Sequence, residues 1–368
     1  MTMPNTQHMS ETSQRPPVTR VGVIGWLRAN LFNTWYNSLL TILILWLFYK
    51  AIPPFVDWAI LDAVWGNVES TVCRQTDGAC WAFLYEKANL ILFGLYPFEE
   101  QWRPTIAMII FVSLVALSCH PKAWRKSLIF AWVIGVPAIA ILMWGGILGL
   151  SYVPNTRWGG LPLTLLLSGL GLMFGFPIGV FLALGRRSNM PTIRTICITY
   201  IELIRGVPLI TILFMASVMF PLFLPTGLTI DKLLRAQIGL IMFASAYLAE
   251  AVRGGLQSLP SGQYEAADSL GLSYWKKMRL IILPQALRIS IPALVNSFIS
   301  FFKDTSLVII IGLFDLMGAT KAALTDAAWR GFYKEAYLFT AIIYFVFCFF
   351  MSKYSQYLEQ RLYTGTRR

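Results

Sequence analysis

The sequence has few charged residues. Asp, Glu, Lys and Arg make up 13% of its 368 residues, whereas soluble globular domains contain about 25%. Apolar residues make up 57%. Because so few charges cannot cover a surface that faces water, this composition excludes an ordinary soluble enzyme and a disordered protein. It indicates a protein that uses the lipid bilayer as its solvent.

Residues that serve catalysis or nucleotide binding are also scarce. The two histidines, His8 and His120, fall in a polar tail and in a loop, so catalysis by histidine has little support. The sequence contains no GxxxxGK[ST] phosphate-binding loop, and this chain is therefore not expected to bind ATP. We expect no catalytic residue, no bound metal and no cofactor of its own.

The N-terminus lacks the apolar core of a cleaved signal peptide. Residues 1–20 are polar, with Gln, Ser, Thr and Pro. We expect residues 1–30 to form a disordered cytoplasmic tail. The first apolar run starts near Trp35 and is expected to be an uncleaved first membrane helix.

Long apolar runs are abundant, and a helix needs about 20 mostly apolar residues to cross a bilayer. They predict an all-α integral membrane protein with about eight transmembrane helices. With the N-terminus inside, the inside segments hold 19 Lys and Arg residues and the outside segments hold 9, which predicts that both termini are cytoplasmic. The eight runs are roughly Trp35–Phe55, Pro104–Cys119, Leu128–Leu150, Leu161–Leu184, Ile201–Leu224, Ala236–Val252, Ile289–Leu313 and Ala336–Tyr357.

Cysteine is sparse, but two of the five cysteines lie close together. Cys73 and Cys80 both fall in the first outside loop, residues 56–103. In an oxidising periplasm they would form a small-loop disulfide, and two free thiols are the alternative. A zinc site is not expected, because no second Cys or His pair follows.

The segment between the sixth and seventh runs is unusually long for a connection and has the pattern of two helices. Glu265 falls in the first turn of a predicted helix, where a negative charge is favourable. Gly271 accepts the left-handed backbone that ends helices. Ser273 would cap a second helix, Tyr274 to Leu283, and Pro284 would interrupt it. An amphipathic hairpin that only anchors the loop is the alternative reading.

This segment resembles the EAA motif of ABC importer permeases. That motif spells EAA, three residues, Gly, about nine residues, then an apolar residue and Leu-Pro. The resemblance implies a coupling helix that sits in a groove on a separate ATPase subunit, which would bind ATP and Mg. The residues that match the motif are Glu265, Ala266, Ala267, Gly271, Leu283 and Pro284.

The resemblance extends from Leu161 to Leu362. The phrases Tyr200–Phe214, Ala246–Gly271 and Leu283–Val308 are similar to the polar amino-acid branch of type I importer permeases. The added N-terminal part looks most like the M-type subunit of general L-amino-acid transporters. Such a subunit is implied to import L-amino acids across the bacterial inner membrane by alternating access. Its implied partners are a homologous second permease subunit, an ATPase dimer and a periplasmic amino-acid-binding protein.

The runs and the resemblance together predict the domain organisation. A permease core is preceded by three added membrane helices, and the chain begins and ends in cytoplasmic tails. The predicted segments are the tail 1–30, the added helices 31–155 with a periplasmic loop 56–103, the core 156–362 with a coupling-helix loop 258–286, and the tail 363–368.

Charged residues inside the apolar runs are candidates for the substrate path, because a charge at membrane depth costs about 2.5–3.5 kcal/mol on insertion scales. On a helix, residues three apart can pair, so Glu202 could pair with Arg205 and Glu250 with Arg253. Structural ion pairs near the interface are the alternative reading. The candidates are Glu202, Arg205, Glu250, Lys303 and Asp304.

Glycine and proline mark further positions in these runs. Gly206, Pro208 and Pro292 could break helices and expose backbone groups to a substrate, or could only kink them. Gly171, Gly175 and Gly179 recur every four residues, which allows close helix packing and fits a face between subunits.

Two other functions are alternatives to the importer. An ion-coupled secondary amino-acid transporter would be self-sufficient and usually shows internal repeats, which are not evident here. A membrane-embedded enzyme would need paired Asp, His clusters or a Ser/His set at membrane depth.

Overall fold

The computed structural model describes residues 22–120, 123–225, 227 and 229–363. The chain divides into two compact units, one up to Cys80 and one from Trp81 onward. Most of the expected N-terminal tail, residues 1–21, lies outside the described residues, as does the expected C-terminal tail at 364–368.

One long apolar helix dominates the N-terminal unit. α1 (Gly22–Asn30) precedes α2 (Trp35–Val56), which continues as the π-helical segment η2 (Asp57–Leu61). α1 corrects the expected tail through residue 30, since the apolar stretch at 22–27 contains no proline and forms a helix. No residue of α2 is buried, as expected of an apolar helix that faces lipid.

A disulfide closes the N-terminal unit. α3 (Ser70–Cys73) ends at Cys73, which is bonded to Cys80 with 5.5 Å between their Cα atoms. Both cysteines are buried. The structure therefore has the disulfide rather than the two free thiols that were the alternative.

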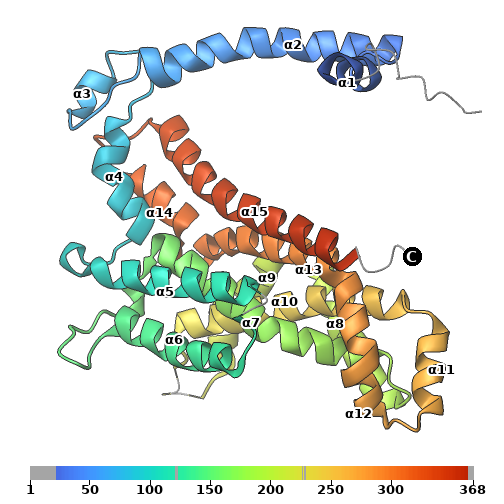
Figure 1. The fold of residues 1–368 in the computed structure, drawn as a ribbon. Coiled ribbons are helices and arrows are strands. Elements are labelled where there is room, and N and C mark those ends of the chain that lie inside the picture. The colour runs from blue at the N-terminus through green and yellow to red at the C-terminus, as the bar shows by residue number, and fades with distance from the viewer. Residues whose placement is uncertain (1–21, 121–122, 226, 228, 364–368) are drawn as a thin grey trace, which may run out of the picture. The chain divides into compact units, whose positions relative to one another are not determined.

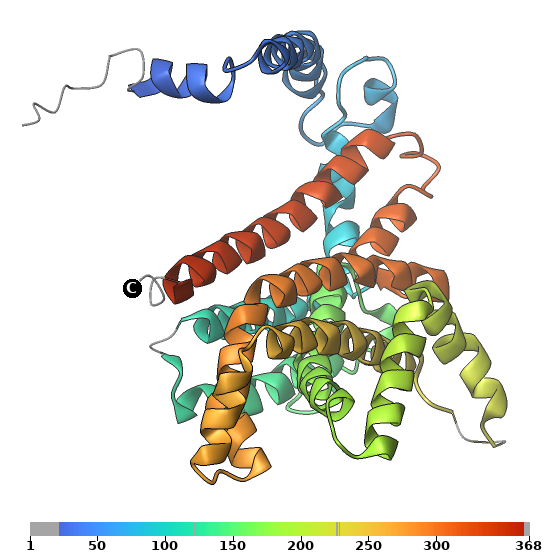
Figure 2. The same cartoon turned by 90° about the vertical axis from the view of Figure 1, so that its right-hand side faces the viewer.

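The C-terminal unit is almost entirely helical (Figures 1 and 2). Its longest helices are α7, α10, α13 and α15, and α7 packs chiefly along α10. Its elements in order are α4 (Ala82–Phe93), η3 (Phe98–Glu100), α5 (Trp102–Cys119), α6 (Lys126–Trp144), η5 (Asn155–Arg157), α7 (Gly160–Arg186), α8 (Pro191–Gly206), α9 (Leu209–Phe214), η6 (Met215–Met219), η7 (Phe220–Phe223), α10 (Lys232–Gln257), α11 (Ser261–Ser269), α12 (Tyr274–Lys277), η8 (Met278–Ile282), α13 (Leu283–Asp304), η9 (Thr305–Ile311), β1 (Phe314–Asp315), α14 (Leu316–Ala323) and α15 (Tyr333–Tyr363).

Seven helices in the described residues are long and apolar enough to cross a membrane, and one bent pair would make an eighth. The predicted all-α membrane fold with about eight spans is thereby confirmed. The predicted span 201–224 differs in shape, because α8 and the helix from Leu209 to Phe223 meet at an angle of 102°. Val207 and Pro208 are both extended there, since proline lacks an N–H and disfavours helix in the residue before it. Pro292, in contrast, lies inside the continuous helix α13.

Glycines let α7 and α10 approach closely. A Cβ added at Gly175 would lie 2.9 Å from the Cβ of Ala244, and one added at Gly179 would lie 2.9 Å from the carbonyl oxygen of Ser245. Ala244 and Ser245 belong to α10. The expected packing face between subunits is therefore used inside this chain, because these small residues are covered by its own helix.

Part of the segment expected as the loop 56–103 is a docked helix. α4 packs on α14 and α7, and the Nζ of Lys87 lies 2.7 Å from a carboxylate oxygen of Asp326. That hydrogen bond holds the pKa of Asp326 below its ordinary value. A Cβ added at Gly94 would lie 2.5 Å from the Cα of Gly159, so only glycine permits this close approach of two backbones.

Candidate functional site

The predicted coupling segment is a short helix with a well-formed end. α11 carries Glu265, Ala266 and Ala267. Gly271 follows with φ +66°, and its N–H donates to the carbonyl of Asp268 at 2.9 Å. The next N–H, of Leu272, donates to the carbonyl of Ala267 at 3.4 Å. This pair of bonds is a Schellman motif, which confirms Gly271 as the predicted helix stop.

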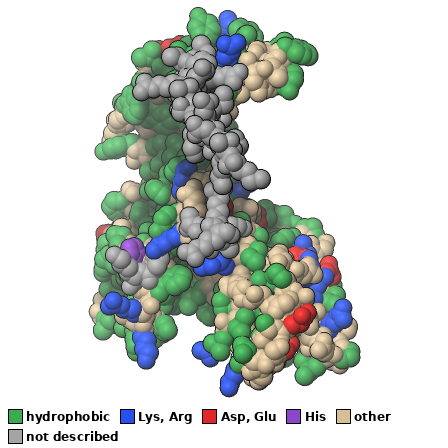
Figure 3. Space-filling model, turned by 45° about the vertical axis from the view of Figure 1, so that its right-hand side comes forward, with side chains coloured by type: hydrophobic (Ala, Val, Ile, Leu, Met, Phe, Trp, Pro, Cys, Tyr) green, Lys and Arg blue, Asp and Glu red, His purple; other side chains and the backbone are tan. Residues whose placement is uncertain are grey.

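The motif residues divide into an inner and an outer set. Ala267 is 1% exposed and packs inward, whereas Glu265 and Ala266 are exposed. Beside them, Leu270 and Trp275 are exposed apolar side chains. Charged side chains of both signs gather at this end of the unit (Figure 3). The inner side of this segment thus packs a small alanine, and its outer side presents apolar and charged side chains together.

Side-chain contacts hold α11 against the helix that follows it. The Nζ of Lys277 lies 2.5 Å from a carboxylate oxygen of Asp268. The side-chain amide of Gln285 donates to the side-chain oxygen of Gln263 at 3.1 Å. α11 and the helix that follows it are therefore linked both close to the turn and farther from it.

Pro284 does not interrupt the second helix, contrary to the prediction. α12, η8 and α13 follow one another without a break, and residues Tyr274–Ile311 make one helical span. Pro284 stands in the first turn of α13, and the wider π-helical turn of η8 before it relieves the clash that a proline causes inside an α-helix. Ser273 occupies the predicted cap position, but its side chain makes no capping hydrogen bond.

An arginine that the sequence did not single out joins this segment to the membrane helices. The Nη1 of Arg187, just after α7, donates to the carbonyl of Leu256 at 2.7 Å and to the hydroxyl of Tyr264 at 2.9 Å. The hydroxyl of Tyr264 in turn donates to Leu256 at 3.0 Å. Arg187 and Tyr264 are 77 positions apart, so no local pattern could have paired them.

The charged candidates at the same end form one network rather than separate pairs. Glu250 contacts Arg253 as predicted and also lies 3.5 Å from Arg186 and 3.6 Å from Arg205. Glu202 pairs with Arg186 at 2.8 Å, not with Arg205 as predicted. The reason is that the end of α7 brings Arg186 between α8 and α10, which sequence spacing along one helix cannot reveal.

A separate cavity lies between α7, α10 and α13. It measures about 280 Å³, near the lower bound of pockets that hold small molecules. Polar groups from α13 meet apolar walls from the other two helices. Its lining residues are Leu172, Phe243, Ala244, Tyr247, Leu248, Asn296, Ser297, Ser300, Phe301 and Asp304.

The predicted substrate-path residues lie in three different places. Asp304 lines this cavity, whereas its neighbour Lys303 is exposed and does not. Glu202 and Glu250 belong to the charged network. Arg205 belongs to that network and also lies 5.5 Å from the ring centre of Tyr247, a cavity residue. Tyr247 thus connects the network with the cavity. In the part of the chain that the structure describes, no group of three potential metal ligands occurs.

Comparison with known proteins assigns the chain to a family. Residues 175–363 match the model of the "Binding-protein-dependent transport system inner membrane component". The "Inner membrane amino-acid ABC transporter permease protein YhdY" of Escherichia coli (strain K12) is 52% identical, over 92% of this chain and 93% of that protein. The "Glutamate/glutamine/aspartate/asparagine transport system permease protein BztC" of Rhodobacter capsulatus is 38% identical, over 94% of this chain and 95% of that protein.

A solved structure is also similar. The "Crystal structure of an amino acid ABC transporter with histidines" matches 55% of this chain and 92% of its own, at 36% identity and a TM-score of 0.49. The family model covers the coupling segment, the charged network and the residues of α10 and α13 around the cavity. The chain therefore belongs to the binding-protein-dependent transport system inner membrane components, and it is a multi-pass inner-membrane permease subunit of an ABC importer.

Proposed function

We propose that this chain carries L-amino acids from the periplasm to the cytoplasm, with both of its termini on the cytoplasmic side. The coupling segment supports the proposal most directly. Its exposed face at Glu265, Ala266 and Leu270 would dock on an ATPase subunit, which would bind ATP and Mg. The two relatives of nearly full length are both named for amino-acid transport.

The cavity would hold the amino acid in one of its states. The carboxylate of Asp304 would accept hydrogen bonds from the substrate ammonium, and Asn296 and Ser300 would supply further polar contacts. The apolar wall of Phe243 and Leu248 would face the side chain of the substrate. A cavity of about 280 Å³ admits one such molecule.

The contacts of Arg187 suggest how docking would reach the helices. A shift of α11 would move Tyr264, and through Arg187 it would move the ends of α7 and α10. Those helices carry part of the cavity wall. Two arrangements of such packed helices, biased by nucleotide on the ATPase, would give alternating access. The partners would be an ATPase dimer, a homologous second permease subunit and a periplasmic binding protein.

ATP hydrolysis in proteoliposomes tests this function. The vesicles would contain this chain, a homologous permease partner and the ATPase, with and without binding protein loaded with single L-amino acids. We expect hydrolysis to rise severalfold only with loaded binding protein. Amino-acid flux driven by an ion gradient without ATP would instead establish the secondary-transporter alternative.

A further inference from the structure

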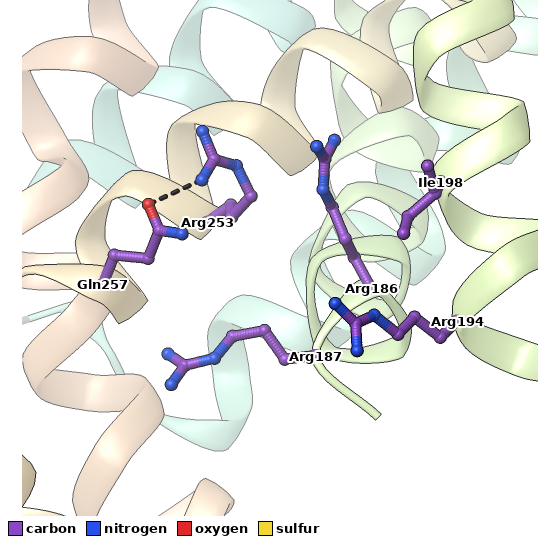
Figure 4. Close-up of a pocket in the computed structure, with 6 residues that line it drawn as sticks. All are labelled: Arg186, Arg187, Arg194, Ile198, Arg253 and Gln257. Carbon is purple, nitrogen blue, oxygen red and sulfur yellow. Dashed lines mark hydrogen bonds between the residues drawn. The ribbon is translucent and has the colours of Figure 1, made fainter. Parts of the chain in front are cut away.

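A second pocket, separate from the cavity, lies where α7 and α10 end and α8 begins. It measures about 380 Å³. Four arginines, from the end of α7 and the residue after it, from α8 and from α10, line it (Figure 4), and no acidic residue does. The lining residues are Arg186, Arg187, Arg194, Ile198, Arg253 and Gln257.

The charges around this pocket do not balance. Arg186 and Arg253 share the carboxylates of Glu202 and Glu250. The side chain of Arg187 donates only to neutral oxygens. Among the described residues, the side chain of Arg194 has no ion pair or hydrogen bond, and only its backbone N–H donates, to the carbonyl of Met190. The pocket and the adjoining network together hold five guanidinium groups and two carboxylates, so three positive charges have no negative counterpart. The five arginines are Arg186, Arg187, Arg194, Arg205 and Arg253, and the two carboxylates are those of Glu202 and Glu250.

Such a concentration of arginine favours a multivalent oxyanion. Like charges held together repel one another, and a bound anion relieves that repulsion. The guanidinium fork donates two parallel hydrogen bonds to a phosphate group, a geometry that lysine cannot offer. Arg194 also lies in the first turn of α8, where the positive end of the helix dipole adds to the potential.

The surroundings of the pocket point to a lipid as the source of the phosphate. The pocket lies at the ends of two candidate membrane spans, α7 and α10, the depth at which headgroups lie. On α8, Ile196 is 63% exposed and Leu203 is 61% exposed, so an apolar surface suited to acyl chains adjoins the arginines. Basic pockets between membrane helices on the cytoplasmic side bind anionic headgroups.

We propose that this arginine-lined pocket binds the phosphate of an acidic phospholipid headgroup. Arg187 and Arg194 supply the guanidinium groups that lack acidic partners. Arg187 also holds Tyr264 of the coupling segment, so an occupied pocket would stabilise that contact.

Lipid binding by the full-length chain in its purified complex tests the proposal. Native mass spectrometry would count bound molecules during titration with phosphatidylglycerol and with phosphatidylcholine. We expect wild type to retain phosphatidylglycerol preferentially, and Arg194→Gln to weaken that retention about tenfold, as the loss of a charge-assisted hydrogen bond would. Arg194→Lys should retain an intermediate affinity.

Arg288→Gln is the matched control, because Arg288 is exposed on α13 and does not line the pocket. This variant also loses one positive charge, and its affinity for phosphatidylglycerol should stay within about twofold of that of wild type. Equal loss in both variants, or equal retention of both lipids by wild type, would overturn the site. A third arm titrates inorganic phosphate alone. Inorganic phosphate could bind to wild type and not to Arg194→Gln while wild type shows no preference between the two lipids. That outcome would overturn the lipid as the source of the phosphate and assign the pocket to a soluble phosphate.

Discussion

Asp304 is the acidic side chain in the wall of the cavity, beside the hydroxyls of Ser297 and Ser300. If it recognises the substrate ammonium, Asp304→Asn should reduce uptake of loaded amino acids at least tenfold, because a charge-assisted contact is lost. Uptake in proteoliposomes measures this effect. The neighbouring Lys303→Gln is the control, since that side chain is exposed and does not line the cavity. Equal effects of the two changes would argue against a substrate role for the cavity.

The buried carboxyl group of Asp315 should make the stability of the protein depend on pH. Its carboxylate caps α14 by accepting from the N–H groups of Met317 and Gly318, and burial raises the pKa of this carboxyl to about 6. The unfolded pKa is about 3.9, so the folded protein holds the proton more tightly between these values. Stability should therefore fall as pH rises from about 4 to about 6.

Asp315→Asn keeps a capping oxygen but does not titrate. Thermal unfolding of the purified protein, measured from pH 4 to pH 7, should show a flatter profile for this variant than for wild type. An unchanged profile would assign the pH dependence to other groups.

Gly271 sets the geometry of the turn after α11. Its φ of +66° costs a residue with a side chain about 1–2 kcal/mol, although a Cβ there would meet no atom within 4 Å. Gly271→Ala should loosen the turn and lower the stimulation of ATP hydrolysis by loaded binding protein. Gly262→Ala, also free of contacts and without a positive φ, should leave stimulation unchanged. Loss in both variants would indicate a general requirement for glycine in the segment.

At the scale of elements, the sequence predicted what depends on local patterns. The apolar runs located the spans, and the glycine after Ala267 located the end of α11. It marked Pro208 as a residue that could break or only kink the helix, and the structure has the break. It did not predict the angle of 102°, because the chain is apolar on both sides of the bend and hydropathy does not report the direction of a helix. It misjudged Pro284, because the π-helical turn that accommodates the proline is set by tertiary packing rather than by propensity.

The same limit applies to the site. Spacing of three along a helix identified the pair Glu250 and Arg253, but the partner of Glu202 comes from another helix. Tyr247 and Asn296 carried no signal, because a neutral polar residue in an apolar run looks like ordinary packing. Asp304 was found only because a charge inside such a run is rare.

The proposed orientation in the membrane rests on the distribution of basic residues and can be tested by labelling. In intact cells, a membrane-impermeant maleimide should label Thr156→Cys, in the segment before α7 that is expected outside. It should not label Ser261→Cys, at the start of α11, until the membrane is permeabilised. The endogenous cysteines are replaced by serine as background. The reverse pattern would place the coupling segment outside the cell and exclude docking to a cytoplasmic ATPase.

The helix from Tyr274 to Ile311 has no break at Pro284. This continuity bears on the order in time of changes at the coupling segment and at the cavity. The helix carries Trp275 at the coupling end and Asp304 in the cavity wall. These residues are 29 positions apart, which is about 44 Å along the helix at 1.5 Å per residue, and the helix changes direction between α12 and α13 (Figures 1 and 2). A relay across separate helices could pause with one end moved and the other at rest. In one continuous helix, the proposed docking and a change at the cavity would belong to the same kinetic step, so signals from the two ends should rise with one rate constant.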